Sequence, residues 1–191
     1  MRVIGGFLKG KKIDFIKSAT TRPLRDFVKE NIFNILNHSN LIDISLEDAS
    51  VLDLYSGVGS FGIECISRGA KKTTFVESDK IALETLKNNI EQLKIEKKSR
   101  VFGAKTNYFF NQLNENDKFE IIFLDPPFSE DFFIEELKLI KKTNIFNENH
   151  IVIIHREKMS NDNFLDVINV VSKKNYGRSK VIFGHFKSNT A

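Results

Sequence analysis

Apolar and polar positions along most of this chain alternate between short buried runs, typical of strands, and the spacing of amphipathic helices. A buried run over 51–55 is followed by a glycine-rich turn and a helical pattern that continues to about residue 68. The next strand is expected over 73–76, and a helix over 80–93 follows it with Ser78 or Asp79 as its N-cap. Strands that alternate with helices predict a mostly parallel sheet covered by helices on both faces.

The second half of the chain continues this alternation and then leaves it. Strands are expected over 100–103, 119–124 and 150–155, with a helix over 131–141. Two β-prone runs then flank Tyr176-Gly177. They cover 164–172 and 179–186, although a helix competes for 164–170. We therefore predict an α/β fold whose mostly parallel seven-stranded sheet is closed by a C-terminal antiparallel hairpin.

The first forty residues precede this alternation and form an extension to it. Two β-prone runs around Gly5-Gly6 and Gly10 predict a hairpin within residues 1–15, and residues 28–36 have an amphipathic helical spacing. The chain contains no internal repeat, low-complexity tract or Pro/Gly linker. We expect one domain over 1–191, with 1–40 as a basic hairpin and helix extension and 41–191 as the core.

Positive charge is concentrated in that extension. The chain has a net charge of +4, and residues 1–29 hold eight Lys and Arg against two Asp, so their balance of +6 leaves −2 for the remainder. A basic arm suits a polyanion, because neutralising phosphates releases counterions. A solvated arm without a partner is an equal alternative on charge alone. The side chains that we expect to contact nucleic acid are Lys9, Lys11, Lys12, Arg22, Arg25 and Lys29.

Composition excludes several other classes of protein. A single cysteine cannot form a disulfide framework or a thiolate metal cluster, and the four histidines lack metal-ligand spacing, so we expect no metal. The start of the chain lacks the apolar run of a signal peptide, and no stretch reaches membrane-spanning length. We expect a cytoplasmic protein without a membrane partner. The absence of a long heptad pattern favours a monomer.

The glycine-rich turn has the chemistry of a ligand-binding loop. Residues 57–62 match GxGxxG after a strand, and Glu77 lies twenty residues beyond Gly57, so the literal motif indicates an NAD-dependent enzyme. Asp53, however, would oppose a pyrophosphate by roughly 1–4 kcal/mol for charges about 4 Å apart. S-adenosylmethionine carries an ammonium and a sulfonium and no phosphate, so we favour it as the cofactor. The residues expected to hold it are Asp53, Tyr55, Gly57, Gly59 and Glu77.

A second motif, Asp125-Pro126-Pro127-Phe128, follows the strand expected over 119–124, at the same edge of the sheet. Successive prolines donate no backbone hydrogen bonds, so the segment offers acceptors, the Asp125 carboxylate and the Pro126 carbonyl. An exocyclic base amine presents two N–H donors, and two converging acceptors can direct its lone pair at a methyl donor. Phe128 could stack on an extruded base, a contact worth roughly 1–3 kcal/mol. The motif predicts methylation of a base amine, against the plainer alternative of an Asp-Pro turn with a core phenylalanine.

With these motifs in place, the sequence resembles the RsmD family of bacterial small-subunit rRNA guanine-N2 methyltransferases. The resemblance runs from Gly5-Gly6, through Arg22-Pro23 and residues 30–34, to the glycine loop, the DPPF motif and Tyr176-Gly177. It implies a Rossmann-like S-adenosylmethionine-dependent methyltransferase fold. The implied substrate is the N2 of a guanine in 16S rRNA, guanine 966, within an assembled or partly assembled small ribosomal subunit.

The chain also departs from the family pattern. Leu24 and Phe27 stand where the family usually has Thr and Arg. Beyond the third strand an Asp or Asn is expected near the adenine amino group, and Asn107 is the residue that we assign there, with backbone groups as the alternative. Three other functions remain open, namely a DNA or RNA adenine-N6 methyltransferase, an NAD(P)-dependent oxidoreductase and a non-catalytic RNA-binding module.

Overall fold

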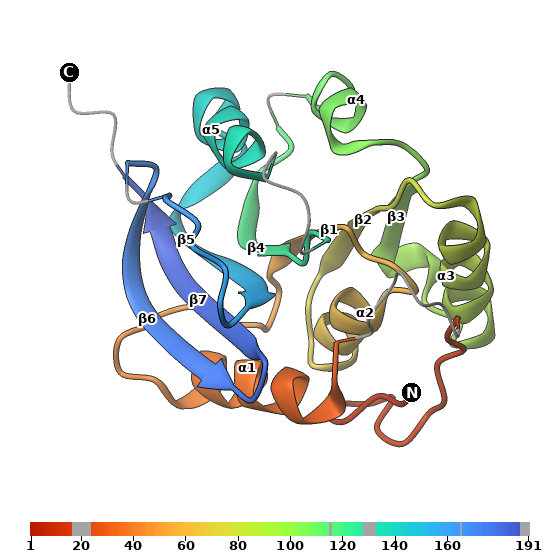
Figure 1. The fold of residues 1–191 in the computed structure, drawn as a ribbon. Coiled ribbons are helices and arrows are strands. Elements are labelled where there is room, and N and C mark those ends of the chain that lie inside the picture. The colour runs from red at the N-terminus through yellow and green to blue at the C-terminus, as the bar shows by residue number, and fades with distance from the viewer. Residues whose placement is uncertain (17–23, 115, 128–132, 165, 188–191) are drawn as a thin grey trace.

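A computed structural model describes residues 1–16, 24–114, 116–127, 133–164 and 166–187. These residues contain one seven-stranded sheet with the strand order β3-β2-β1-β4-β5-β7-β6 (Figure 1). The strands are β1 (Ser50–Leu54), β2 (Lys72–Val76), β3 (Ser99–Phe102), β4 (Phe119–Leu124), β5 (Phe146–Glu157), β6 (Ile168–Tyr176) and β7 (Ser179–Phe186). The helices are α1 (Asp26–His38), α2 (Ser60–Ser67), α3 (Lys80–Gln92), the 3-10 turn η1 (Glu96–Lys98), α4 (Thr106–Phe110) and α5 (Phe133–Thr143).

Strand direction follows the sequence-based expectation. Neighbouring strands from β3 to β5 pair in parallel, whereas β7 is antiparallel to both β5 and β6. The strand order reverses between β1 and β4, and ligands of such sheets bind beyond the carboxyl ends of the strands at this point. The predicted fold class is therefore confirmed.

Alternate residues of the central strands supply two separate cores. On β4, Ile121 and Phe123 face the cluster that contains α1 and α2, and Ile122 and Leu124 face the cluster that contains α4 and α5. Figure 1 shows α1 and α5 on opposite sides of the sheet. Because strand side chains alternate between faces, every odd-numbered residue of β1, β4 and β5 near the carboxyl ends lies on the α1/α2 side.

Two strands begin more than two residues away from their predicted starts. β5 begins at Phe146, four residues before the expected start, because Phe146 pairs with Phe119. The register between β4 and β5 shifts after this pair. The polar residues 147–149 interrupt the apolar pattern, so the sequence does not indicate this first part of the strand. β6 begins only at Ile168. The Phe164 carbonyl accepts from the Val167 and Ile168 amides, and these bonds form a single turn before the strand. Neither difference moves the carboxyl ends of the parallel strands.

The predicted N-terminal hairpin is present as a short antiparallel pair, in which Arg2 is bridged to Lys12. The Val3 amide donates to the Lys11 carbonyl at 2.9 Å, and the Ile13 amide donates to the Met1 carbonyl at 3.0 Å. The turn of this hairpin is attached to α2. The Ile4 and Gly5 amides donate to the Glu64 carboxylate at 2.8 and 2.7 Å. Further along, the Phe7 and Leu8 amides donate to Ser67. The amides of the turn, which the hairpin itself leaves without partners, are therefore satisfied by α2.

Lys29, expected to contact nucleic acid, is instead fully buried. Its Nζ lies 3.5 Å from a Glu64 oxygen and donates to the Arg2 carbonyl and to Ser60 Oγ. Burial lowers the pKa of Lys29, and the charge of Glu64 partly opposes that shift. The expectation is wrong because Lys29 lies on the buried face of α1 with Val28 and Ile32, where its ammonium joins the extension to the core.

We expect Lys29→Met to lower the free energy of unfolding by about 3 kcal/mol, because removal of one partner from a buried ion pair leaves the other charge poorly compensated. Urea denaturation with linear extrapolation would measure the change. Lys9→Met, at an exposed position of the same extension, is the matched control and should stay within about 0.5 kcal/mol of the parent. Equal effects of the two substitutions would contradict a structural role for Lys29.

Candidate active site

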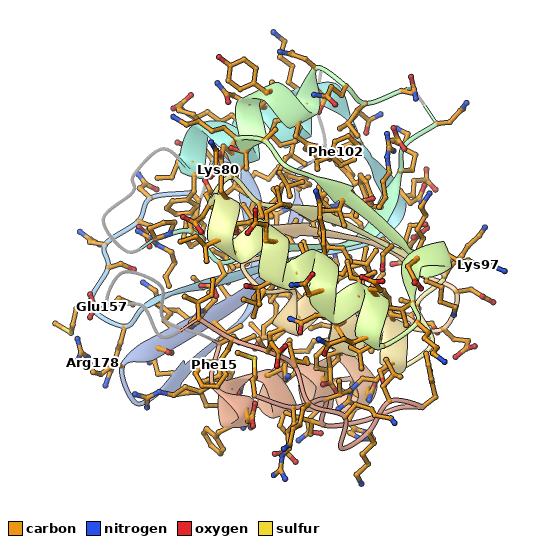
Figure 2. The ribbon with its side chains drawn as sticks, turned by 90° about the vertical axis from the view of Figure 1, so that its right-hand side faces the viewer. Phe15, Lys80, Lys97, Phe102, Glu157 and Arg178 are labelled. Atoms are coloured by element: carbon orange, nitrogen blue, oxygen red, sulfur yellow. The ribbon has the colours of Figure 1, made fainter. Side chains whose placement is uncertain are left out.

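A cavity of about 300 Å³ lies at the carboxyl ends of β1, β2 and β4, where the strand order reverses. The core strands contribute charged residues to its wall, and the N-terminal extension contributes apolar ones, including Phe15, which Figure 2 labels. The residues discussed below that line it are Asp53, Tyr55, Gly57, Glu77, Asp125, Pro126, Pro127 and His155. Sequence motifs that lie far apart in the chain therefore meet at one site.

Asp53 is a carboxylate that the structure buries without completing its hydrogen bonds. It is 1% exposed, its Oδ2 accepts from the Gly62 amide at 2.9 Å, and its Oδ1 has no hydrogen-bond partner among the described residues. Burial raises the pKa of Asp53 well above its ordinary value, and the nearby charges of Asp125 and Glu77 raise it further. A cationic ligand in this cavity would stabilise the ionised form.

Glu77 closes the glycine loop from the end of β2. One carboxylate oxygen accepts from the Gly57 amide and the other accepts from the Asp79 amide, both at 2.7 Å. Each oxygen retains a second lone pair, so the carboxylate can still accept two hydroxyl groups of a ribose. Gly59 enters α2 at a φ of 87°, and a Cβ there would lie 2.5 Å from Leu86, which accounts for the glycine.

Tyr55 connects the cavity to α5. Its backbone has a φ of 60°, an uncommon conformation for a residue other than glycine, and its hydroxyl donates to the Glu136 carboxylate. The same carboxylate accepts from Thr106 at the start of α4. The loops after β1 and β3 are therefore held by one acidic side chain on the opposite face of the sheet.

Asp125 follows β4 directly, and its carboxylate is only about one-fifth exposed. Its Oδ1 lies 2.8 Å from Nδ1 of His155, which is the residue next to it in register on β5. Sequence analysis missed His155. The signal was present, because 155 ends a predicted strand beside the one that leads into Asp125.

Arg156, the next residue, lies on the other face of β5 and was also missed. It is 1% exposed, and its Nη1 donates to the Pro127 carbonyl at 3.1 Å. Nη2 and Nε donate to the two oxygens of Asp162 at 2.9 and 3.1 Å. No sequence motif indicates that Asp162, beyond a turn, pairs with this arginine.

Several predicted site residues are placed elsewhere or are not described. Phe128 and Arg22 lie outside the described residues. Asn107 is in the first turn of α4, is exposed, and accepts from the Tyr108 amide instead of lining the cavity. Leu24 is buried and lines the cavity, whereas Phe27 is exposed and packs edge-on against Tyr176. The side chains of the basic set that are both described and exposed are Lys9, Lys11, Lys12 and Arg25.

The cavity fits S-adenosylmethionine better than a dinucleotide. The unpartnered Asp53 oxygen, with Asp125 and Glu77 nearby, makes an acidic site that would repel a pyrophosphate and attract a cation. Among the described residues, no group of three or more His, Cys, Asp or Glu side chains is arranged to hold a metal ion. In the same residues no helix is long and apolar enough to cross a bilayer.

The fold and this cavity define a Rossmann-like methyltransferase. Comparison with known proteins agrees, since the family model described as "Conserved hypothetical protein 95" matches residues 1–185. The chain is 33% identical to the ribosomal RNA small subunit methyltransferase D of Haemophilus influenzae over 159 residues, which are 83% of this chain and 79% of that protein. The chain belongs to this family, and the resemblance to the RsmD family is confirmed.

Solved structures give the same result for the fold. "Putative methyltransferase yhhF" from Escherichia coli superposes with a TM-score of 0.81 at 25% identity, covering 99% of both chains. "SMU.776, a putative methyltransferase complexed with SAH" has a TM-score of 0.61 at 19% identity over 81% of this chain and 48% of that one. The second likeness concerns the fold alone.

Asp53 makes cofactor affinity dependent on pH. Because burial raises the pKa of the free carboxyl, and a cation favours its ionised form, binding of S-adenosylmethionine should release protons and strengthen as the pH rises through that pKa. Asp53→Asn should bind about tenfold or more weakly at neutral pH and should release fewer protons. Calorimetry in two buffers of different ionisation enthalpy measures both quantities.

Titration with S-adenosylhomocysteine, which lacks the sulfonium charge, tells whether that charge is the one Asp53 stabilises. The free Asp53→Asn protein should keep its stability at pH values where the parent loses it, since ionisation of a carboxyl with a raised pKa destabilises the folded state. Equal proton release by parent and variant would refute this role of Asp53.

Proposed function

We propose that this protein is an S-adenosylmethionine-dependent rRNA methyltransferase that modifies the exocyclic N2 of a guanine in the 16S rRNA of the small ribosomal subunit. The carrying observation is that Asp125 and the Asp53 carboxylate, which lacks a hydrogen-bond partner on Oδ1, line one cavity. One acid suits a cationic methyl donor and the other suits an amine acceptor. The name of the Haemophilus influenzae relative supports rRNA of the small subunit as the substrate.

The cofactor would be held by Asp53, Glu77 and the loop around Gly57. When bound, it supplies a methyl group on a sulfonium sulfur, which an amine nitrogen can take with loss of one proton to water. Glu77 accepts from the ribose hydroxyls, and the glycine loop permits close approach of the backbone. The buried carboxylate of Asp53, which lines the cavity, would compensate the positive charge of the cofactor.

Asp125 and the Pro126 carbonyl would hold the target amine. Oδ1 of Asp125 accepts from His155, so Oδ2, with both of its lone pairs, and the Pro126 carbonyl are the acceptors that we assign to the two amine hydrogens. The lone pair of the amine is delocalised into the ring, and two fixed acceptors favour the pyramidal form that directs it at the methyl group. Phe128 completes this proposal as a stacking face for the base.

The nucleotide, guanine 966, and the presentation of the substrate in an assembled or partly assembled subunit are carried over from the family resemblance. Such a substrate implies action in the cytoplasm. A monomer is the proposed form, because the large apolar side chains that are exposed among the described residues are spread over several elements.

Asp125→Ala should lower the rate of methyl transfer by about 10²–10³-fold or more, because an orienting acceptor is lost from the transition state. Its affinity for S-adenosylhomocysteine should remain close to that of the parent. The assay expresses each variant in a strain that lacks the gene and measures N2-methylguanosine in digested 16S rRNA by mass spectrometry.

Asp117→Ala is a matched control for this variant. Asp117 has a similar exposure of 21% and an ion pair with Arg100 at 2.7 Å, but it does not line the cavity. Normal methylation by Asp125→Ala would end the proposed role of Asp125. Restoration by the parent of N6-methyladenine instead of N2-methylguanosine would move the proposal to adenine.

The exposed lysines of the N-terminal extension should set the salt dependence of RNA binding. Replacement of Lys9, Lys11 and Lys12 by Gln should reduce the slope of log K against log salt by about 2–3, since each phosphate contact contributes close to one unit. Filter binding to a 16S rRNA fragment at several salt concentrations gives this slope.

The control makes the same change in charge outside the extension, in the segments that lead into β2 and β3. Lys71, Lys94 and Lys97 are exposed and precede β2 or β3, and Figure 2 shows Lys97 beyond the far end of α3 from Lys80. Their replacement by Gln should leave the slope nearly unchanged. Equal reductions for both triple variants would show that the extension is not a specific contact surface.

A further inference from the structure

We propose that His155 and Arg156 are positioning residues that together fix the Asp125-Pro126-Pro127 segment in the geometry required for methyl transfer. This inference rests on the proposed role of Asp125. The two residues are consecutive at the end of β5, they point to opposite faces of the sheet, and each bonds to a different part of the segment.

The segment has few free torsion angles. The contacts from His155 and Arg156 restrain two of them, the one that sets the plane of the Asp125 carboxylate and the one that sets the orientation of the Pro127 carbonyl. The proline rings fix φ at 126 and 127. The terminal torsion of an aspartate is soft, so the plane of the Asp125 carboxylate is not defined by its own rotamer preference. The hydrogen bond between His155 Nδ1 and Asp125 Oδ1, at 2.8 Å, defines this plane. Oδ2 then keeps both of its lone pairs for an amine.

Arg156 acts on the other end of the segment. Its bond to the Pro127 carbonyl fixes the orientation of the peptide group that follows Pro127, which the proline ring does not control. The orientation of the Pro127 carbonyl is thereby set. Both contacts come from one rigid central strand, so the two ends of the segment are held relative to a single element.

The guanidinium of Arg156 is itself rigidly held. Asp162 receives two of its donors, and the group lies 4.5 Å from the centre of the Phe133 ring. Burial raises the pKa of Asp162, but hydrogen bonds from Arg156 and Ser160 and the charges of Arg156 and Lys180 outweigh it and lower the pKa overall. Asp162 is therefore an ionised partner of a buried cation, and the donor to Pro127 has little freedom to move.

The alternative is that both residues only stabilise the fold. Arg156 contributes to the core beside α5, and His155 is 6% exposed, so either could serve packing alone. Packing predicts loss of stability and of cofactor affinity with an unchanged turnover of the folded enzyme. Positioning predicts a fall in kcat, with KM for RNA and the affinity for S-adenosylhomocysteine nearly unchanged.

The test compares two substitutions of His155 that differ in one hydrogen-bond donor. His155→Phe retains a ring and removes the donor, whereas His155→Asn places an amide nitrogen near the position of the imidazole Nδ1. We expect His155→Phe to lower kcat by about 10²-fold, the cost of a misplaced reacting group, and His155→Asn to recover at least about tenfold of that loss. Affinity for S-adenosylhomocysteine should stay within about threefold in both variants.

Arg156→Lys tests the second contact, because a single ammonium cannot pair with both oxygens of Asp162 and also reach Pro127. Its kcat should fall by about tenfold or more, measured below the unfolding transition that circular dichroism records. Arg178→Lys is the control. Arg178 also pairs with an acid, Glu157 at 3.2 Å, but its side chain is 72% exposed. Figure 2 labels it at the edge of the molecule, and its substitution should leave kcat unchanged.

Three results separate the possible failures. Full kcat in His155→Phe, with Asp125→Ala inactive, would overturn the positioning role alone. Equal kcat in His155→Phe and His155→Asn at a reduced level would also overturn it, because the donor would not matter. Full activity in Asp125→Ala would instead remove the proposed function of Asp125, on which the inference rests.

Discussion

The parallel pairing of β1 with β4 is the constraint on which the site depends. It joins two strands that lie about seventy residues apart, and it aligns Asp53 with Phe123 so that Asp125 emerges on the same face as Asp53. A shift of one residue in that register would send one carboxylate to the α4/α5 side. The apolar side chains on both faces of β4, which are all buried, make such a shift costly.

The same constraint gathers three carboxyl groups in one partly buried cavity. Asp53, Glu77 and Asp125 meet in one cavity, and burial together with mutual repulsion raises the pKa of Asp53. The free protein therefore carries an electrostatic cost that a cationic ligand removes. The same three carboxyl groups therefore favour binding of a cationic cofactor and oppose binding of a cofactor that contains phosphate. They do so although the glycine loop resembles that of dinucleotide enzymes.

Much of this molecule could be predicted from its sequence. The residues that were misplaced or missed have one thing in common, because their surroundings depend on tertiary contacts that no local pattern encodes. Strand and helix periodicity predicted the sheet, and the positions of Asp53, Glu77 and Asp125 followed from where strands end. Lys29 was misassigned because charge is visible in a sequence whereas burial is not. Asn107 was placed by family pattern, but it lies in the first turn of α4, where its side chain accepts from the Tyr108 amide and does not line the cavity. The partners of Arg156 depend on a turn whose path no local pattern encodes.

The attachment of the N-terminal extension to α2 has a consequence for how such an enzyme can change. Glu64 holds the amides of Ile4 and Gly5, the side chain of Arg68 and the ammonium of Lys29 around one buried carboxylate. These partners come from three segments, so a substitution of Glu64 itself removes the bonds of all of them at once. The exposed lysines Lys9, Lys11 and Lys12 are not among these partners, so the charge of the extension can change while its attachment to α2 is kept.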